Sequence, residues 1–153
     1  MTDADFTAFW KYLVSKKYGN PPSPLTENER LFYGANWLRG SVPRSGFIGY
    51  FENSTGDDIK AAHEALRSMQ LKDGLFLLQR AQYLVLGDRP LKIGSEQIDV
   101  FPEELTGKER EKASDELDRA LRPIEEAFYK LDDDIYEALC TFADQHGLFR
   151  PNG

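Results

Sequence analysis

The chain has 153 residues, of which 41% are hydrophobic and 12% aromatic, which suits one domain that builds its core without metals or crosslinks. Its only cysteine, Cys140, excludes an internal disulfide bond. The acidic N-terminus is not a signal peptide and no apolar run is long enough to span a bilayer, so we expect a cytoplasmic protein with no membrane association.

The net charge of −7 is distributed unevenly along the chain. Residues 1–98 carry 12 Lys and Arg against 11 Asp and Glu, whereas residues 99–153 carry 7 against 15. Nucleic-acid binding needs a basic footprint, so this balance argues against direct contact between the last third and nucleic acid. It suits a basic protein surface as the partner. The alternative is an ordinary solvated helical exterior.

The spacing of apolar residues predicts helices along most of the chain. Five are expected before residue 87: one opening at Asp3 or Asp5 and stopping at 18–20, one from Thr26 to about Gly40, a short one through Phe51, one opening at Asp57 or Asp58, and one over about 72–86. The second begins with a capping box, in which Glu29 reaches back to the amide of Thr26. The fifth is apolar on several sides, so we expect it to be the central, most buried helix.

Residues 87–105 lack a helical pattern, and a stretch of this length is either functional or mobile. Thr106 and Glu109 predict a second capping box at the start of a charged helix, which Pro123 kinks or replaces with a new helix. The last helix begins near residues 132–134 and stops at Gly147. The sequence therefore predicts an all-α fold in a single compact domain of about seven or eight helices over 1–153. An N-terminal helix and a Pro-rich link would form 1–25, and the core 26–147.

Residues with catalytic or metal-binding spacing are scarce. Neither histidine has a partner at a metal-ligand spacing, and no phosphate-binding loop or nucleophile motif is present. Asp132, Asp134 and Glu137 superficially resemble a calcium loop but lack its glycine and its downstream bidentate glutamate. We therefore predict no enzymatic activity, no cofactor and no metal.

The charged helix contains four opposite-charge pairs at i,i+4, which balance many of its acids locally: Lys112–Glu116, Asp115–Arg119, Asp118–Arg122 and Glu126–Lys130. Less compensated acids lie elsewhere in the last third, and if they cluster they form one acidic face. Acids at i and i+4 lie about 6 Å apart along a helix, close to the roughly 6.8 Å that two steps along a DNA strand cover. The partner-binding candidates are Asp99, Glu103, Glu104, Asp132, Asp133, Asp134 and Glu137, and Asp144 is a further uncompensated acid.

Two segments resemble a known family. The run Ser45-Gly46-Phe47-Ile48-Gly49-Tyr50-Phe51-Glu52-Asn53-Ser54-Thr55-Gly56-Asp57 is similar to the Gly-Gly-Phe…Tyr-Phe-x-Asn-Ser-Ser-Gly signature of a bacterial DNA-mimic-protein-like family, with Ser45 in place of the first Gly. Residues 126–136 resemble the C-terminal pattern of that family, and the similarity covers about residues 28 to 147. The resemblance implies an all-α fold, no known catalytic activity, and a relative that occupies the DNA-binding surface of a transcriptional regulator.

The signature segment has a structural and a functional interpretation. In the structural one, Phe47, Tyr50 and Phe51 fill the core, Asn53, Ser54 and Thr55 cap or turn the chain into the next helix, and Gly56 supplies an unusual backbone angle. In the functional one, Tyr50, Asn53 and His63 line a small-ligand pocket. Family-motif residues to locate in the structure are Gly46, Phe47, Tyr50, Phe51, Asn53, Ser54 and Gly56.

Our leading hypothesis is a non-enzymatic protein-binding module whose acidic C-terminal face engages a basic protein, such as a DNA-binding transcriptional regulator. Three alternatives stay open: an immunity or antitoxin-type inhibitor of a basic toxin, a small-ligand-binding protein, and a structural or oligomeric protein. The sequence is compatible with both a monomer and a homodimer.

Overall fold

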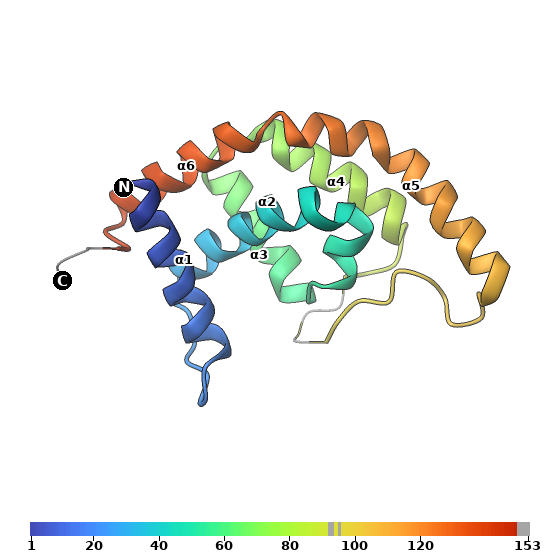
Figure 1. The fold of residues 1–153 in the computed structure, drawn as a ribbon, viewed down its shortest axis with the longest axis horizontal. Helices are drawn as coiled ribbons and strands as arrows, with labels where there is room; N and C mark the ends of the chain where they lie inside the picture. Colours follow the sequence, from blue (N-terminus) through green and yellow to red (C-terminus); the bar gives the residue numbers. More distant parts are fainter. Residues whose placement is uncertain (92–93, 95, 150–153) are drawn as a thin grey trace.

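The computed structural model describes residues 1–91, 94 and 96–149 and confirms the all-α class (Figure 1). This part of the chain contains six helices, not seven or eight: α1 (Asp3–Tyr18), α2 (Glu27–Glu52), α3 (Gly56–Ser68), α4 (Lys72–Leu86), α5 (Gly107–Tyr129) and α6 (Asp132–Gln145). Its one strand-like pairing is an isolated bridge between Thr55 and Gln97. Two helix boundaries that the sequence predicts, near Gly40 and at Pro123, are not formed, and each absence has a physical explanation.

Helix α2 does not end near Gly40, as predicted, but continues to Glu52. The helix persists past Gly40 because the next two side chains, Ser41 and Val42, are buried in the core. The interruption comes instead at Gly46, whose backbone angles (φ 69°, ψ 177°) are not helical. The two helices predicted on either side of Gly40 are therefore one helix with a kink further along.

Helix α5 likewise continues through Pro123, where a kink or a new start was predicted. Pro123 is exposed, whereas Leu121 and Ile124 on either side of it are buried. The missing N–H donor thus faces solvent while the apolar side of the helix stays packed. Figure 1 shows α5 as one continuous ribbon, followed by α6 along the same edge of the molecule.

Three helices begin with a complete capping box, at Thr2, Thr26 and Thr55. The box predicted for Thr26 and Glu29 is therefore confirmed. The box predicted for Thr106 and Glu109 is wrong: Thr106 occupies the N-cap position of α5, but its side chain accepts no capping hydrogen bond. The next residue, Gly107, has a positive φ of 57°, so the backbone at the start of α5 does not follow the path that a capping box requires.

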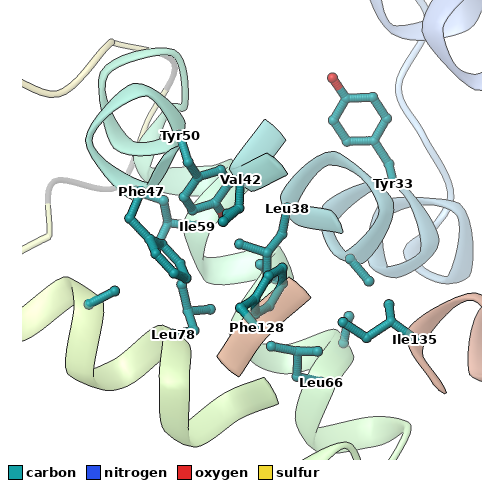
Figure 2. Packing of buried hydrophobic residues seen from close by; sticks show 14 of the residues in the cluster. Tyr33, Leu38, Val42, Phe47, Tyr50, Ile59, Leu66, Leu78, Phe128 and Ile135 are labelled. Carbon is teal, nitrogen blue, oxygen red and sulfur yellow. The ribbon is translucent and has the colours of Figure 1, made fainter. Parts of the chain in front are cut away.

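The hydrophobic core is centred on α2, which contacts α1, α3, α5 and α6. Leu38, Val42, Phe47 and Tyr50 of α2 are fully buried, and Figure 2 shows them beside residues of the helices packed around α2. The prediction that the helix over 72–86 is the central one is wrong. Although α4 has the predicted bounds, it lies at the surface and exposes large side chains such as Phe76 and Tyr83. Apolar residues lie on several sides of α4, but the rest of the fold covers only some of those sides.

The two ends of the described chain meet. The Met1 ammonium group lies 3.2 Å from the Asp144 carboxylate, and the rings of Phe9 and Phe149 are 5.7 Å apart. Figure 1 places the N-terminus beside α6. This contact brings the first turn of α1 next to the acidic last helix.

In its described residues, 87–91, 94 and 96–106, the segment between α4 and α5 has no helix, as predicted, and it is anchored to the fold. Arg89 donates hydrogen bonds to the backbone carbonyls of Val85, Leu86, Asp99 and Val100, and Val100 is buried. Across the helices of the described residues, none combines the length and the apolar character needed to cross a membrane.

Candidate protein-binding surface

Helix α6 presents an acidic outer face. It contains Asp132, Asp133, Asp134, Glu137 and Asp144 and neither Lys nor Arg. Its apolar residues Ile135, Leu139, Phe142 and Ala143 are buried, so the helix is amphipathic and holds its carboxylates toward the outside. Three of the acids lie in the first turn, where the helix dipole stabilises negative charge.

Two of the five carboxylates of α6 are compensated by cations. Asp132 forms an ion pair with Arg39 of α2, with 3.0 Å between Oδ1 and Nε, and Asp144 pairs with the Met1 ammonium group. Within the described residues, Asp133, Asp134 and Glu137 lie in no ion pair. The uncompensated charge of this helix is therefore concentrated in its first two turns.

Asp133, Glu137 and Asp144 lie along one side of α6. They are four and seven residues apart in turn, and eleven residues correspond to about three helical turns. The rise per residue separates the first two by about 6 Å along the axis. That interval is close to the roughly 6.8 Å covered by two steps along a DNA strand.

The structure does not bring all of the predicted acidic residues together. Asp132, Asp133, Asp134 and Glu137 are neighbours on α6, whereas Asp99, Glu103 and Glu104 are exposed in the segment that precedes α5. The 23 residues of α5 lie between the two groups, a length of about 35 Å. The α6 group therefore lies at the junction of α5 and α6, and the other group precedes the opposite end of α5 (Figure 1).

Helix α5 is less neutralised by local pairs than its sequence predicted. Of the four i,i+4 pairs expected, only Lys112–Glu116 forms an ion pair in the described structure, at 3.9 Å. Arg119 instead donates from Nε to the backbone carbonyl of Asp115. Exposed pairs of long side chains gain little over hydration, so these side chains are not drawn together.

Sequence reasoning missed Asp3 as part of the α6 surface. The Tyr136 hydroxyl donates a hydrogen bond to the Asp3 carboxylate, which raises the pKa of Tyr136 well above its usual range. The two residues are 133 positions apart. Only the meeting of the two ends of the chain makes them neighbours, and no local pattern in the sequence indicates that contact.

The signature segment contributes to the core. Phe47, Tyr50, Phe51 and Ser54 are fully buried. The Ser54 hydroxyl accepts a hydrogen bond from the Trp37 indole N–H at 2.9 Å and donates one to the Tyr50 carbonyl. These contacts close the C-terminal end of α2 and hold it against the start of α3, so the structural interpretation of these residues is confirmed.

Two further positions of the signature segment turn the chain. Asn53 is the exposed C-cap residue of α2. Gly56 is the buried first residue of α3 and has no positive φ, so the unusual backbone angle predicted for it is wrong. Gly46 adopts a positive φ, and a Cβ atom there would lie only 2.6 Å from Oε2 of Glu125. That same oxygen accepts the Phe47 N–H at 2.7 Å, which the kink leaves without a helical partner.

Comparison with known protein families matches the chain to the DMP19-like proteins over residues 23–146. The chain belongs to the DMP19-like protein family. The resemblance predicted from its two segments is thereby confirmed. No curated protein and no solved structure gives a significant match.

The pocket interpretation of the DMP19-like signature does not fit this arrangement. The Tyr50 side chain is completely enclosed, its hydroxyl has no hydrogen-bond partner in the described structure, and burial raises its pKa. Asn53 is exposed. His63 contacts Gln82 of α4, with 2.6 Å between Nε2 and Oε1, and burial lowers its pKa. A ligand could reach Asn53 but not Tyr50.

A metal site is likewise not formed by the predicted acids. Within residues 1–91, 94 and 96–149, no three His, Cys, Asp or Glu side chains are arranged so that they could hold a metal ion. Asp132 is engaged with Arg39, while Asp134 faces a separate hollow beside Gly74 and Leu131. What the α6 surface offers is a group of carboxylates on one rigid helix, an arrangement suited to recognising cations on another molecule.

Proposed function

We propose that this DMP19-like protein is a non-enzymatic DNA mimic that works in the bacterial cytoplasm, where its acidic face occupies the DNA-binding surface of a basic protein such as a transcriptional regulator. The observation that carries the proposal is that α6 has five carboxylates and neither Lys nor Arg, and that three of the five, Asp133, Asp134 and Glu137, are exposed and lie in no ion pair of the described chain. Membership of the DMP19-like family supports the same interpretation.

Charge complementarity gives this surface a mechanism. A DNA-binding surface is basic because it neutralises phosphates, and a row of fixed carboxylates offers it a similar pattern of negative charge. No cation of the described chain forms an ion pair with Asp133, Asp134 or Glu137, so these carboxylates are available to cations of a partner. Attraction between exposed charges accelerates association and weakens as salt is added. We therefore expect the affinity for the partner to fall steeply with ionic strength.

The second acidic group gives the proposal a length scale. Asp99, Glu103 and Glu104 precede the N-terminal end of α5, the α6 group follows its C-terminal end, and the helix between them is about 35 Å long. Dimeric DNA-binding proteins contact two half-sites about 34–36 Å apart, one turn of the double helix. A dimeric regulator could therefore place one basic element at each acidic group.

The test is capture of partners from a lysate of the native cell on the immobilised protein, with elution by salt and by double-stranded DNA. We expect a basic DNA-binding protein that DNA displaces. The variant with Asp133→Lys, Asp134→Lys and Glu137→Lys should weaken its binding roughly tenfold or more at low salt. The same charge change in the first turns of α5, as Glu109→Lys, Glu111→Lys and Asp115→Lys, leaves α6 intact and should weaken binding less than the α6 variant does.

A third variant, with lysine at positions 99, 103 and 104, measures the contribution of the second group. Equal affinity of the α6 variant and the wild-type protein would contradict the proposal. Capture of a basic nuclease that DNA also displaces would redirect it to an immunity-type inhibitor that uses the same surface. Failure to capture any basic protein would remove the support for mimicry.

A further inference from the structure

A hollow with a volume of about 470 Å³ lies where α1, α2 and α6 meet, next to the acidic face of α6. Aromatic side chains from two helices, Phe6 and Trp10 of α1 and Tyr136 of α6, form part of its lining. Two carboxylates, Asp3 and Asp133, also line it. The hollow thus combines apolar ring surfaces with negative charge, and Asp133 belongs to both the hollow and the acidic face.

The positive charge inside the hollow is already balanced. Arg39 lines it, but this guanidinium pairs with Asp132 and lies over the Tyr136 ring, 4.9 Å from the centroid. Asp132 balances Arg39, and the two carboxylates that line the hollow, Asp3 and Asp133, have no cationic partner in the described chain. The hollow retains a deficit of positive charge. An anionic ligand is disfavoured here, whereas a cation restores the balance.

A polar side chain in the hollow is also incompletely bonded. Asn36 is only 8% exposed, and its Oδ1 accepts a hydrogen bond from Nη1 of Arg39 at 3.1 Å. Its amide nitrogen has no hydrogen-bond partner among the residues that the structure describes. This nitrogen is not one of the fully buried polar atoms, so it reaches solvent and can donate to a carbonyl oxygen that enters with a ligand.

We infer that this hollow receives one arginine side chain of the basic protein that binds the acidic face of α6. The inference rests on the function proposed above and adds the chemistry of one contact. A guanidinium is planar, stacks on aromatic faces and binds carboxylates through two parallel hydrogen bonds, so it matches this lining better than a lysine ammonium group does. In the arrangement we propose, its plane lies against Trp10, because the Arg39 guanidinium already lies over the Phe6 and Tyr136 rings. Asp3 and Asp133 accept its hydrogen bonds, and the Asn36 amide donates to a backbone carbonyl of the incoming segment.

The two tryptophans of the chain provide an internal control for a binding test. Trp10 lines the hollow, whereas the Trp37 indole N–H is held by Ser54 in the core. The full-length protein, labelled with nitrogen-15, is titrated at low salt with N-acetyl-L-arginine methylamide as the probe. We expect the Trp10 indole signal to shift in a saturable manner while the Trp37 signal stays in place. N-acetyl-L-lysine methylamide should bind at least about threefold more weakly.

Two pairs of variants separate the hollow from general acidity. Asp133→Asn should weaken probe binding up to about fivefold, while Asp134→Asn, which faces a different hollow, should leave it unchanged. Thr7→Tyr fills the hollow from the exposed side of α1 without changing any charge, and it should abolish the Trp10 response. Ala8→Tyr, at the next exposed position, is its matched control.

The outcomes distinguish this inference from the proposed function. A Trp10 signal that does not move, or that moves equally with Trp37, overturns the inference. A captured basic partner that the Lys substitutions on α6 release but Thr7→Tyr binds with full affinity also overturns it, and leaves the proposed function intact. Loss of partner affinity by at least about fivefold in Thr7→Tyr but not in Ala8→Tyr supports the inference. If no basic partner is captured at all, the proposed function fails, while the probe titration still decides whether the hollow binds a guanidinium.

Discussion

The backbone N–H of Phe47 donates a hydrogen bond to Oε2 of Glu125, 78 residues further along the chain, at 2.7 Å. The bond joins the kink of α2 to the C-terminal part of α5. The kink at Gly46 interrupts the regular hydrogen bonding of α2, and the carboxylate from α5 satisfies the Phe47 donor. Glu125, which lies outside the DMP19-like signature segment, therefore supplies the hydrogen-bond acceptor that the kink in this segment needs.

Glu125→Ala should lower the free energy of unfolding by about 1–3 kcal/mol, because it leaves the Phe47 N–H without an acceptor next to the core. The neighbouring Glu126→Ala removes an exposed carboxylate and should change the same quantity by less than about 0.5 kcal/mol. Urea unfolding of the two variants and the wild-type protein measures the difference. Equal stability of the two variants would show that the bond does not hold the kink.

Gly46→Ala should also be destabilising, by about 2 kcal/mol or more, and for two reasons. A residue with a Cβ atom is strained at φ 69°, and the new atom would lie 2.6 Å from the Glu125 carboxylate. Combining Gly46→Ala with Glu125→Ala separates the two effects, because the double variant keeps the backbone strain but loses the collision. If strain alone acts, the two losses add; if the collision contributes, the double variant loses less than their sum.

Most helices were predictable from local chemistry, and the exceptions show where local chemistry is insufficient. Thr26 and Glu29 form their box within four residues, so the sequence alone identifies that start. The extension of α2 beyond Gly40 depends on burial of Ser41 and Val42 by other helices, which no local pattern encodes. The exposure of Phe76 and Tyr83 on α4 is likewise a property of the packed fold.

The sequence indicates which acidic residues are candidates for the surface, but it does not indicate how these residues are arranged in space. The run at 132–134 and Glu137 are close in sequence and therefore close on one helix. Their distance from Asp99 and Glu103 depends on α5 being continuous through Pro123, where the sequence favoured a break or a kink. The contribution of Asp3 depends on two ends of the chain meeting, which only the tertiary fold determines.

Gly34→Ala should destabilise the protein by about 1–3 kcal/mol because α2 and α3 cross closely at this residue. A Cβ atom on Gly34 would lie 2.7 Å from the Ala61 Cβ and 2.8 Å from its carbonyl carbon, so the helices would have to separate. Gly40 is the matched control in the same helix, since a Cβ atom there meets nothing within 4 Å. Gly40→Ala should raise stability by up to about 1 kcal/mol through helix propensity. Thermal unfolding should place the two variants on opposite sides of the wild-type midpoint.

His63 should make stability depend on pH below neutrality. Burial lowers its pKa in the folded protein below the unfolded value of 6.5, and nearby Arg67 acts in the same direction. The unfolded chain therefore binds the proton more readily than the folded one. The resulting stabilisation is present above pH 6.5 and is lost as the pH falls from 6.5 through the folded pKa.

The measurement for His63 is urea unfolding at about pH 7.5 and about pH 5.5. The wild-type protein should lose more stability between the two conditions than the His63→Gln variant. Replacing the exposed His146 by Gln should leave the wild-type loss in place. An identical loss in the wild-type protein and in His63→Gln would assign the pH dependence to other groups.

Lys17 and Asp58 should behave as a coupled pair whose partners are costly to remove singly. The ammonium nitrogen of Lys17 lies 2.6 Å from Oδ1 of Asp58, whose side chain is only 6% exposed, and Oδ2 accepts the Thr55 N–H that begins α3. Asp58→Asn should lower the free energy of unfolding by about 2–4 kcal/mol, since it leaves a half-buried cation without its carboxylate. The double variant with Lys17→Met should recover part of that loss, because the uncompensated charge is gone while Met retains the apolar stem. A double-mutant cycle from urea unfolding measures the coupling. If the two single losses add, the contact contributes no coupling, and the connection between α1 and α3 must come from apolar packing alone.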